Sequence, residues 1–409
     1  MCLVTSSNVG RRVVSRRSAI KGALLGTAAL PCLGCSSRAR QPGAGTSTPT
    51  IGSSPFASPT LDPADRATLA EKLGQMVLVG FRGLTVEPDS PIARDLVDRN
   101  LGGTILFDTD LPLDGATRNI ASPQQLRELT VQLASFATAP FIAVDQEGGS
   151  VARLSPKDGF PATFSAAQLG AVGDPATTYA AAVGIAATLA NAGINLNFAP
   201  VVDVNVNPGN PIIGAFDRSF SADPEIVALH ASEFVRAHHE FGILCTLKHF
   251  PGHGSSAGDS HFGFVDVTGT WSERELQPYS ELIAGGFEDL VMAAHVFNAT
   301  LDAEHPASLS SQTITGLLRR DLGFQGAVIS DDMAMAAITE NYGFEEAIDL
   351  AIRAGVDILL YGNNGPGFDE VVAFRAIDHL AQSVNEGKLS KDRIDESYRR
   401  IAALKSRLQ

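Results

Sequence analysis

The chain has few cysteines and fewer positive than negative charges, and these two shortages restrict its disulfides and its possible binding partners. Of its 409 residues four are cysteines, and 45 aspartates and glutamates outnumber 31 lysines and arginines, which gives a formal net charge of −14. A chain of this charge is not expected to have nucleic acid or an anionic lipid surface as its main partner. Only Cys245 falls in the body of the chain, so we expect no internal disulfide there, and stability must come from a hydrophobic core.

Long hydrophobic runs are also missing, even near the amino terminus. Basic residues that include Arg16 and Arg17 are followed by a modestly apolar run at 23–30, which is too short to span a membrane. This layout is typical of an export signal, and the sequence around the two arginines resembles a twin-arginine signal. We therefore expect residues 1–35 to direct export.

Cys35 ends this segment in a context that resembles a bacterial lipoprotein cleavage site, although Cys32 stands where leucine is usual. Residues 36–61 are rich in Ser, Thr, Pro and Gly, which predicts a flexible linker. The expected product is an exported, extracytoplasmic protein that contacts the membrane only through a lipid anchor on Cys35; without lipidation it would be secreted.

From residue 62 onward, short apolar runs alternate with longer amphipathic segments. The apolar runs are nearly continuous, which is typical of parallel strands covered on both faces. The expected strands are 76–81, 102–107, 141–145, 194–199, 243–249, 290–296, 326–330 and 358–361. Eight strands separated by helices predict an α/β fold, a single (β/α)8 barrel of the TIM type over 62–409, with two C-terminal helices in 367–408.

A doubly wound sheet is the alternative fold. It would require a glycine-rich phosphate-binding turn after the first strand, and Gly80-Phe81-Arg82-Gly83 is a poor match.

Several expected helices begin with a capping residue, and three of these have proline at the next position. They are 122–138, 174–191 and 223–240, which open with Ser122-Pro123, Asp174-Pro175 and Asp223-Pro224, and the last helix, capped by Ser390.

Polar side chains gather where the expected strands end. In chain order they are Asp145 and Glu147, Asp203 and Asn205, Asp217 and Arg218, Lys248 and His249 with the glycine-rich loop to His261, then His295, Asp331 and Asp332. In a parallel barrel these ends converge on one mouth, where active sites lie. Because burying so many polar groups without partners costs several kcal/mol each, we expect a catalytic site there.

Five stretches at these strand ends form a recognisable set. They are Val144 through Gly149 with Arg153, Asp217 through Phe220, Lys248 through Gly254, Asp259 through His261, and Ile329 through Met333. Together they resemble glycoside hydrolase family 3, in particular its single-domain bacterial β-N-acetylglucosaminidases that act on cell-wall fragments. The Asp-Ser-His element belongs to that branch, and the resemblance covers about 62–400. One departure is Ser150, where relatives often carry arginine.

The resemblance implies a role for each matching residue. Asp331 is the expected nucleophile and His261 the expected acid/base, with Asp259 as its partner. Asp145, Arg153, Arg218, Lys248 and His249 are expected to bind the N-acetylglucosamine ring. Asp332 competes with Asp331 as nucleophile, and the family's Ser-Asp pattern favours the aspartate directly after Ser330. Neither a metal nor another cofactor is implied.

A histidine suits the acid role on simple energetic grounds. Keeping a glutamic acid protonated at pH 7 means raising its pKa from about 4.3, which costs about 3.7 kcal/mol. A histidine starts near 6.5, and Asp259 can supply the remainder by stabilising the imidazolium. An aspartate nucleophile predicts a covalent glycosyl-enzyme and retained configuration. The stretch 254–258, rich in glycine and serine, is expected to let the loop move His261 into place.

The chain has only one tryptophan and five tyrosines, so no extended aromatic platform for a polysaccharide is expected. We therefore predict a retaining exo-β-N-acetylglucosaminidase, a β-N-acetylhexosaminidase, that removes terminal non-reducing N-acetylglucosamine from short glycans. The resemblance implies peptidoglycan fragments (muropeptides) as these glycans. We expect the enzyme to act as a monomer.

Four alternatives remain open at this stage. A β-glucosidase of the same family would normally carry its acid/base on a separate C-terminal domain, and a related phosphorylase would use phosphate as acceptor, which a histidine acid/base does not repel. A sugar-binding lipoprotein without catalysis would be expected to have two α/β lobes. A metal-dependent hydrolase would use His249, His253 and His261 as ligands, but no His-x-His strand motif is present.

Overall fold

The computed structural model describes residues 62–365 and 367–408. The expected export signal, Cys35 and the linker 36–61 lie outside the described residues. Within the described part, no helix combines the length and the apolar character that crossing a bilayer requires.

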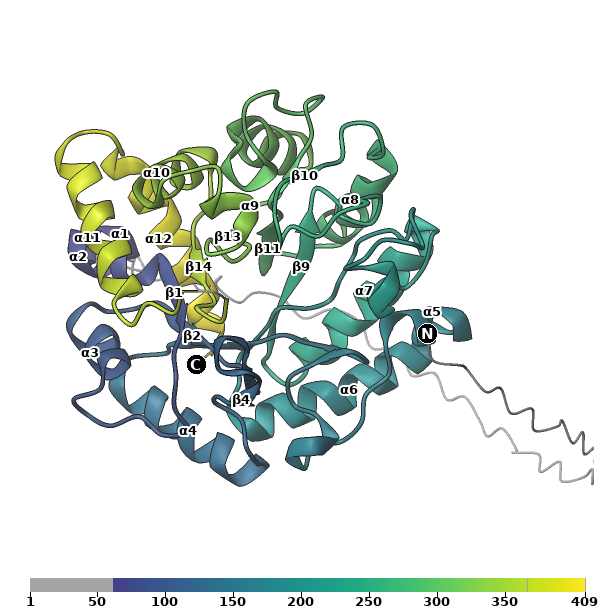
Figure 1. The fold of residues 1–409 in the computed structure, drawn as a ribbon, viewed down its shortest axis with the longest axis horizontal. Helices are drawn as coiled ribbons and strands as arrows, with labels where there is room; N and C mark the ends of the chain where they lie inside the picture. The colour runs from purple at the N-terminus through teal and green to yellow at the C-terminus, as the bar shows by residue number, and fades with distance from the viewer. Residues whose placement is uncertain (1–61, 366, 409) are drawn as a thin grey trace, which may run out of the picture. The chain divides into compact units, whose positions relative to one another are not determined.

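Eight parallel strands form the centre of the domain, surrounded by helices (Figure 1). The strands are β1 (Val77–Gly80), β2 (Gly103–Ile105), β5 (Phe141–Val144), β8 (Leu196–Asn197), β9 (Leu244–Phe250), β11 (Leu290–Ala293), β13 (Ala327–Ser330) and β14 (Leu359–Tyr361). Their order is β13-β11-β9-β8-β5-β2-β1-β14, and a parallel bridge between Ile329 and Ile358 links the two outer strands. The sheet therefore closes, and the predicted (β/α)8 barrel is confirmed.

Helices surround the barrel, and the four that follow Ser122, Asp174, Asp223 and Ser390 begin where these capping residues predicted. The main ones are α2 (Leu69–Gln75), α3 (Pro91–Asp98), α4 (Pro123–Phe136), α6 (Pro175–Ala192), α7 (Pro224–His239), α8 (Gln277–Ala284), a π-helix (Gln312–Asp321), α10 (Phe344–Ala354), α11 (Val372–Asn385) and α12 (Lys391–Lys405). The side chains of Ser122, Asp174, Asp223 and Ser390 each accept a hydrogen bond from a first-turn amide, which satisfies an otherwise unpaired donor. Short helices include α1 (Pro63–Arg66), α5 (Ala166–Val172) and α9 (Ala336–Thr339).

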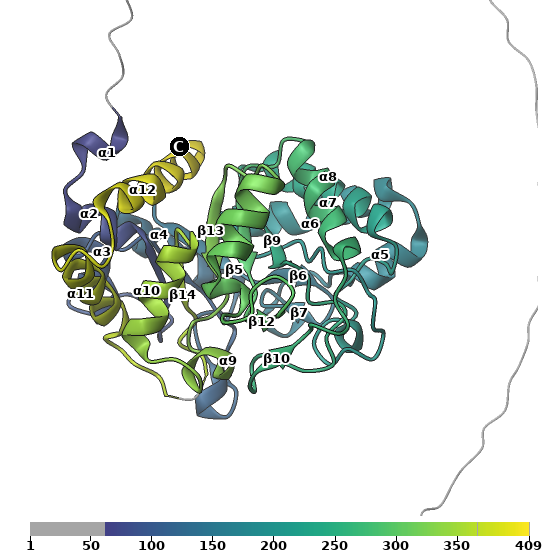
Figure 2. The same ribbon diagram turned by 90° about the horizontal axis from the view of Figure 1, so that it is seen from above.

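Three short strand pairs lie outside the barrel sheet. They are β3 (Thr109–Asp110) with β4 (Ala116–Thr117), β6 (Gln146–Gly148) with β7 (Val151–Ala152), and β10 (Val265–Asp266) with β12 (Val296–Phe297). The last pair joins the loop after β9 to the loop after β11. Figure 2 shows β10, β12 and α9 at one end of the barrel and α12 at the other.

The core fills the barrel and the layer between strands and helices. Every residue of β9 is buried, including Lys248 and His249, which a strand can bury only if their polar groups find partners. Cys245 in the same strand is buried and unpaired, in agreement with the expectation of no disulfide in this part of the chain. The partners of Lys248 and His249 lead to the site.

Candidate active site

The predicted site residues lie at the carboxyl ends of the barrel strands or on the loops that follow. Asp145 directly follows β5, Lys248 and His249 lie near the end of β9, and Asp331 directly follows β13. Arg153 follows β7, Arg218 lies in the loop after β8, and Asp259 and His261 lie in the loop after β9. We name residues 251–264 the acid/base loop.

Lys248 is the centre of a buried ion network. Its Nζ lies 2.8 Å from Asp145 Oδ1 and 2.7 Å from Glu147 Oε1. Glu147 in turn binds Arg218 through two parallel hydrogen bonds of 2.8 and 2.7 Å, the bidentate geometry that a guanidinium and a carboxylate favour. Arg153 approaches Asp145 Oδ2 at 3.5 Å from the more exposed side. Four of the predicted sugar-binding residues are therefore connected through one glutamate.

The charges of this network hold one another ionised. Burial alone would raise the pKa of Glu147, but the charges of Arg218 and Lys248 outweigh it and hold that pKa below its ordinary value. Burial alone would lower the pKa of Lys248, and the carboxylates of Asp145 and Glu147 reverse that effect. Removing one member would leave the others buried without compensation.

His249 has a partner of its own. Its Nδ1 lies 2.6 Å from Asp203 Oδ2, and its backbone amide also donates to that carboxylate. The amide of His253 donates to Asp203 Oδ1 at 2.7 Å. Burial alone would raise the pKa of Asp203, but the charge of His249 and these hydrogen bonds lower it. With the ring Nε2 3.3 Å from Arg218 Nη2, His249 joins the buried network. We name Asp145, Glu147, Asp203, Arg218, Lys248 and His249 the charged floor.

Two adjacent aspartates follow β13, and their environments separate their pKa values. For Asp331, burial would raise the pKa, but the charges of His295, His249 and His261 lower it to about 2. For Asp332, burial raises the pKa to about 6, and the charge of Asp331 adds to this effect. Asp331 is therefore fully ionised at neutral pH. A pair of carboxyl groups separated in this way is a common arrangement for dividing roles in catalysis.

Asp332 also makes hydrogen bonds that hold the local structure. Its Oδ1 accepts from the amide of Ala334 at 3.0 Å, and its backbone carbonyl accepts from His295 Nε2 at 3.0 Å. Within residues 62–365 and 367–408, the one hydrogen bond that the Asp331 carboxylate accepts comes from the neighbouring amide of Asp332, at 2.8 Å. Asp331 is thus the less committed of the two carboxylates and the better placed to act as a nucleophile.

Asp259 and His261 form a separate pair on the acid/base loop. Asp259 Oδ1 lies 2.7 Å from His261 Nδ1 and accepts the His261 backbone amide at 2.9 Å. Because a carboxylate can only accept, Nδ1 carries the proton and Nε2 is left for proton transfer. The His261 side chain is 55% exposed. No hydrogen bond or ion pair joins this pair to the other predicted residues in the described part of the chain, but the charge of His261 reaches Asp331.

Two members of the charged floor, and one buried glutamate next to the acid/base loop, received no role from the sequence. Glu147 stands within the Val144–Gly149 motif and Asp203 follows the fourth strand, but neither was given a function. Their signal was position alone, since each is an acidic residue at a strand end. Glu275, which lies beneath the acid/base loop, had no signal because it is one of many glutamates in amphipathic segments.

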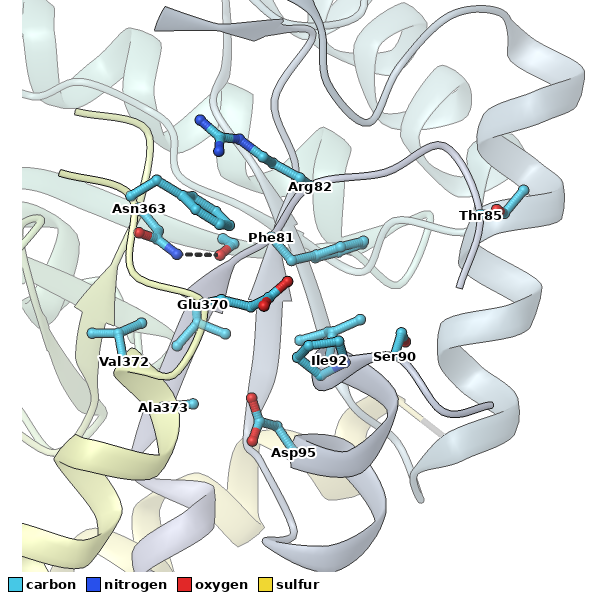
Figure 3. A pocket seen from close by; sticks show the side chains of 14 residues that line it. Phe81, Arg82, Thr85, Ser90, Ile92, Asp95, Asn363, Glu370, Val372 and Ala373 are labelled. Atoms are coloured by element: carbon cyan, nitrogen blue, oxygen red, sulfur yellow. Dashed lines mark hydrogen bonds between the residues drawn. The ribbon is translucent and has the colours of Figure 1, made fainter. Parts of the chain in front are cut away.

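A cleft elsewhere on the domain does not involve these residues. It lies between the end of β1 and the starts of α3 and α11, and its walls include Phe81, Ile92, Asp95 and Val372 (Figure 3). None of the predicted catalytic or sugar-binding residues lines it. Among the described residues, no group of three or more His, Cys, Asp or Glu side chains is arranged to hold a metal ion.

Comparison with known proteins shows the family of the chain. The model of the "Glycosyl hydrolase family 3 N terminal domain" matches residues 68–404. Beta-hexosaminidase LpqI of Mycobacterium tuberculosis is 33% identical over 94% of this chain and 96% of its own length. Beta-hexosaminidase A of Pseudoalteromonas piscicida is 34% identical over 83% of this chain, which spans 61% of that relative.

A solved structure extends the comparison to three dimensions. The family 3 β-N-acetylglucosaminidase from Paenibacillus sp. str. FPU-7 superposes with a TM-score of 0.76 at 38% identity, over 84% of this chain and 63% of that one. The family expected from the motifs and the prediction of a glycoside hydrolase are confirmed by these matches. The chain belongs to glycosyl hydrolase family 3.

Proposed function

We propose that the protein is a retaining, exo-acting β-N-acetylglucosaminidase that removes terminal N-acetylglucosamine from short glycans. The observation that carries the proposal is the pairing of two unlike groups at one barrel mouth. One is the ionised Asp331 carboxylate, and the other is the Asp259–His261 pair, which can deliver a proton. The names of the relatives support the same activity.

In the first step Asp331 attacks the anomeric carbon, and the bond from that carbon to the leaving oxygen breaks. His261 Nε2 gives its proton to the leaving oxygen, while Asp259 stabilises the imidazolium beforehand and holds the ring. The product of this step is a glycosyl ester on Asp331. The pKa of Asp331, lowered to about 2, keeps the nucleophile ionised near neutral pH.

In the second step the now neutral His261 takes a proton from water, whose oxygen attacks the same carbon. The ester bond breaks and Asp331 leaves as a carboxylate, so two inversions give net retention. A histidine can serve both steps near neutral pH because its two protonation states lie close in free energy there.

The charged floor, together with Arg153, is proposed to hold the sugar. Asp145 and Arg153 keep 16% and 30% of their side chains exposed, which makes them the groups best able to meet hydroxyl and amide oxygens of the ring directly. Lys248, His249 and Arg218 are nearly covered. They are proposed to reach the sugar with the few donor positions left over and to fix the orientation of Asp145.

The natural substrate is proposed to be a peptidoglycan fragment, and the cellular site extracytoplasmic. The support for export is the basic, weakly apolar start and Cys35. Metabolic labelling with a fatty acid, compared between the natural chain and Cys35→Ala, tests the anchor. Loss of label in the variant supports it, and equal label contradicts it.

Hydrolysis of aryl glycosides tests the activity. The full chain is expected to release nitrophenol from the β-N-acetylglucosaminide and not from the β-glucoside, with Asp331→Ala inactive on both. Turnover of the glucoside would indicate a β-glucosidase, and N-acetylglucosamine 1-phosphate formed in phosphate buffer would indicate a phosphorylase. Proton NMR should show the β-anomer of the released sugar first. No turnover of either glycoside would favour the sugar-binding protein.

A further inference from the structure

The base of the acid/base loop packs too tightly to accept side chains. A Cβ at Gly254 would lie 1.7 Å from the carbonyl oxygen of Val204, and one at Gly252 would lie 2.6 Å from the Cβ of Glu275. Gly252 also has a φ of 124°, a conformation that other residues rarely adopt. The loop therefore starts from a backbone held between Val204 on one side and Glu275 on the other.

Glu275 binds this backbone directly. It lies in a 3₁₀ helix (Glu273–Leu276), is fully buried, and its Oε2 accepts from the amides of Gly254 at 3.0 Å and Ser255 at 3.3 Å. Its Oε1 is buried and makes no hydrogen bond within the described residues. Burial raises the pKa of Glu275 to about 7 and the charge of Asp203 adds to this, although hydrogen bonding by the side chain of Ser255 and by the two amides lowers it. Burying a carboxyl group with one unpaired oxygen costs free energy, so its presence here requires an explanation.

A short chain of contacts leads from Glu275 to the catalytic pair. Gly254 and Ser255 directly follow His253, whose ring is buried and whose Nδ1 lies 2.7 Å from Ser256 Oγ. The Nε2 of the same ring lies 3.3 Å from the hydroxyl of Ser260, the residue between Asp259 and His261. Burial lowers the pKa of His253 to about 4, so the ring is neutral and can donate at one nitrogen and accept at the other.

The far side of the loop is held independently. The carbonyl of Ser260 accepts from the amide of Ala337 in α9 at 3.3 Å, and β10 pairs with β12 directly after the loop. At the start of the loop, Trp271 Nε1 donates to the carbonyl of Pro251 at 3.0 Å. The backbone of His253 itself is held by Asp203 Oδ1, which accepts its amide, and by Asn210 Nδ2, which donates to its carbonyl, both at 2.7 Å. Glu275 holds the amides of the two residues that follow.

We propose that Glu275 is a positioning residue for the acid/base: by holding the amides of Gly254 and Ser255 it keeps His253 under Ser260 and so fixes the Asp259–His261 pair. The proposal rests on the proposed function, since it assigns His261 the proton transfer. Glu275 itself touches neither the sugar nor the reacting atoms.

The leaving group of the substrate separates this role from a general effect on the fold. A 2,4-dinitrophenyl glycoside loses a weakly basic anion that needs no proton, so kcat/KM, which reports the first step, does not depend on His261. The β-1,4-linked disaccharide of N-acetylglucosamine loses a basic alkoxide and depends on the acid by about 10²- to 10⁴-fold. A misplaced His261 therefore affects only the disaccharide.

Two substitutions divide the properties of Glu275. Glu275→Met keeps the volume and removes the acceptor, whereas Glu275→Gln keeps one carbonyl oxygen facing the two amides. We expect Glu275→Met to lower kcat/KM for the disaccharide by about 100-fold and for the dinitrophenyl glycoside by less than about 3-fold. We expect Glu275→Gln to stay within about 5-fold of the natural enzyme on both. The matched control is Glu273→Met, an exposed glutamate on the same 3₁₀ helix.

The outcomes separate this proposal from the proposed function. Equal losses on both substrates in a folded Glu275→Met variant, or full activity on the disaccharide, would contradict the role of Glu275 alone. A natural enzyme inactive on both glycosides would contradict the proposed function and this proposal with it. If Glu275→Met does not fold, Glu275→Asp, which is one methylene too short for both amides, must show the same selective loss.

Discussion

The charged floor and the acid/base loop differ in how the chain fixes a catalytic group. On the floor, Lys248 and His249 project from a fully buried strand, and each is held by a buried carboxylate, Glu147 at 2.7 Å and Asp203 at 2.6 Å. On the loop, His261 is half exposed and held mainly by Asp259, two residues away. The sugar and the nucleophile need fixed geometry, whereas the acid must reach oxygens of varied leaving groups. The rigid part of the site therefore faces the sugar, which is the same in every substrate.

Removing the nucleophile should have the largest effect. Asp331→Ala deletes the group that forms the covalent bond, so kcat on an aryl N-acetylglucosaminide should fall by about 10⁴-fold or more. Steady-state kinetics on the purified variant measure this. Asp332→Asn is the matched control and should fall much less, because Asp332 acts through its contacts with Ala334 and His295. A larger loss of kcat in Asp332→Asn than in Asp331→Ala would identify Asp332, not Asp331, as the nucleophile.

Removing the acid should have a smaller effect that depends on the substrate. His261→Ala should lower kcat/KM for the disaccharide by about 10²- to 10⁴-fold and leave the dinitrophenyl glycoside nearly unchanged. The same variant should be as stable as the natural protein, because the side chain is exposed. Uniform loss on both substrates would mean that the loop helps bind the sugar, and the contrast with the floor would weaken.

Substitutions in the charged floor should instead lower the stability of the folded protein. Lys248→Met leaves Asp145 and Glu147 buried without their shared cation, which should lower the free energy of unfolding by about 3–5 kcal/mol in urea titration. The control is Lys157→Met, whose half-exposed ion pair with Asp108 should contribute less than about 1 kcal/mol. Similar losses in the two variants would show that the floor is no more rigid than the surface.

The smallest expected effect is on the pH dependence of stability. The pKa of Glu275 rises from 4.5 to about 7 on folding, so its protonated form favours the folded state. That contribution is present below pH 4.5 and is lost as pH rises through 7, by up to about 3 kcal/mol. Glu275→Gln should therefore gain stability over the natural protein between pH 5 and pH 8, with Asp203 and Tyr279 as the neighbouring titratable groups. Parallel stability curves would contradict this.

Much of the fold could be predicted from the sequence because the signals are local. All eight barrel strands and the capped helices occur where apolar runs and Asp-Pro or Ser-Pro pairs predicted them, within a few residues. The pair β10–β12 had no such signal, because two-residue strands leave no periodic pattern. The π-helix Gln312–Asp321 was likewise not expected, since its ten residues read as an ordinary helical pattern.

The sequence indicated which residues form the site, but not how they contact one another. Strand ends and the family motifs brought Asp145, Lys248 and Arg218 to one mouth, yet nothing local indicates that Glu147 links the last two. That link joins residues about 70 to 100 positions apart and depends on strand order and register. The roles given to the predicted residues remain predictions until the variants above are measured.

The tight start of the acid/base loop has a consequence for evolution and engineering. Gly254 is fixed against Val204 at one end of the segment, and Val265 pairs with Val296 at the other. Between them Ser256 and Ser260 are buried and hydrogen-bonded, and the other residues are less constrained. A library that spares Gly252, Gly254, the three buried serines at 255, 256 and 260 and the strand pair should tolerate substitution of the remaining loop positions without loss of the barrel. Leaving-group preference could then be exchanged between relatives by grafting one short peptide.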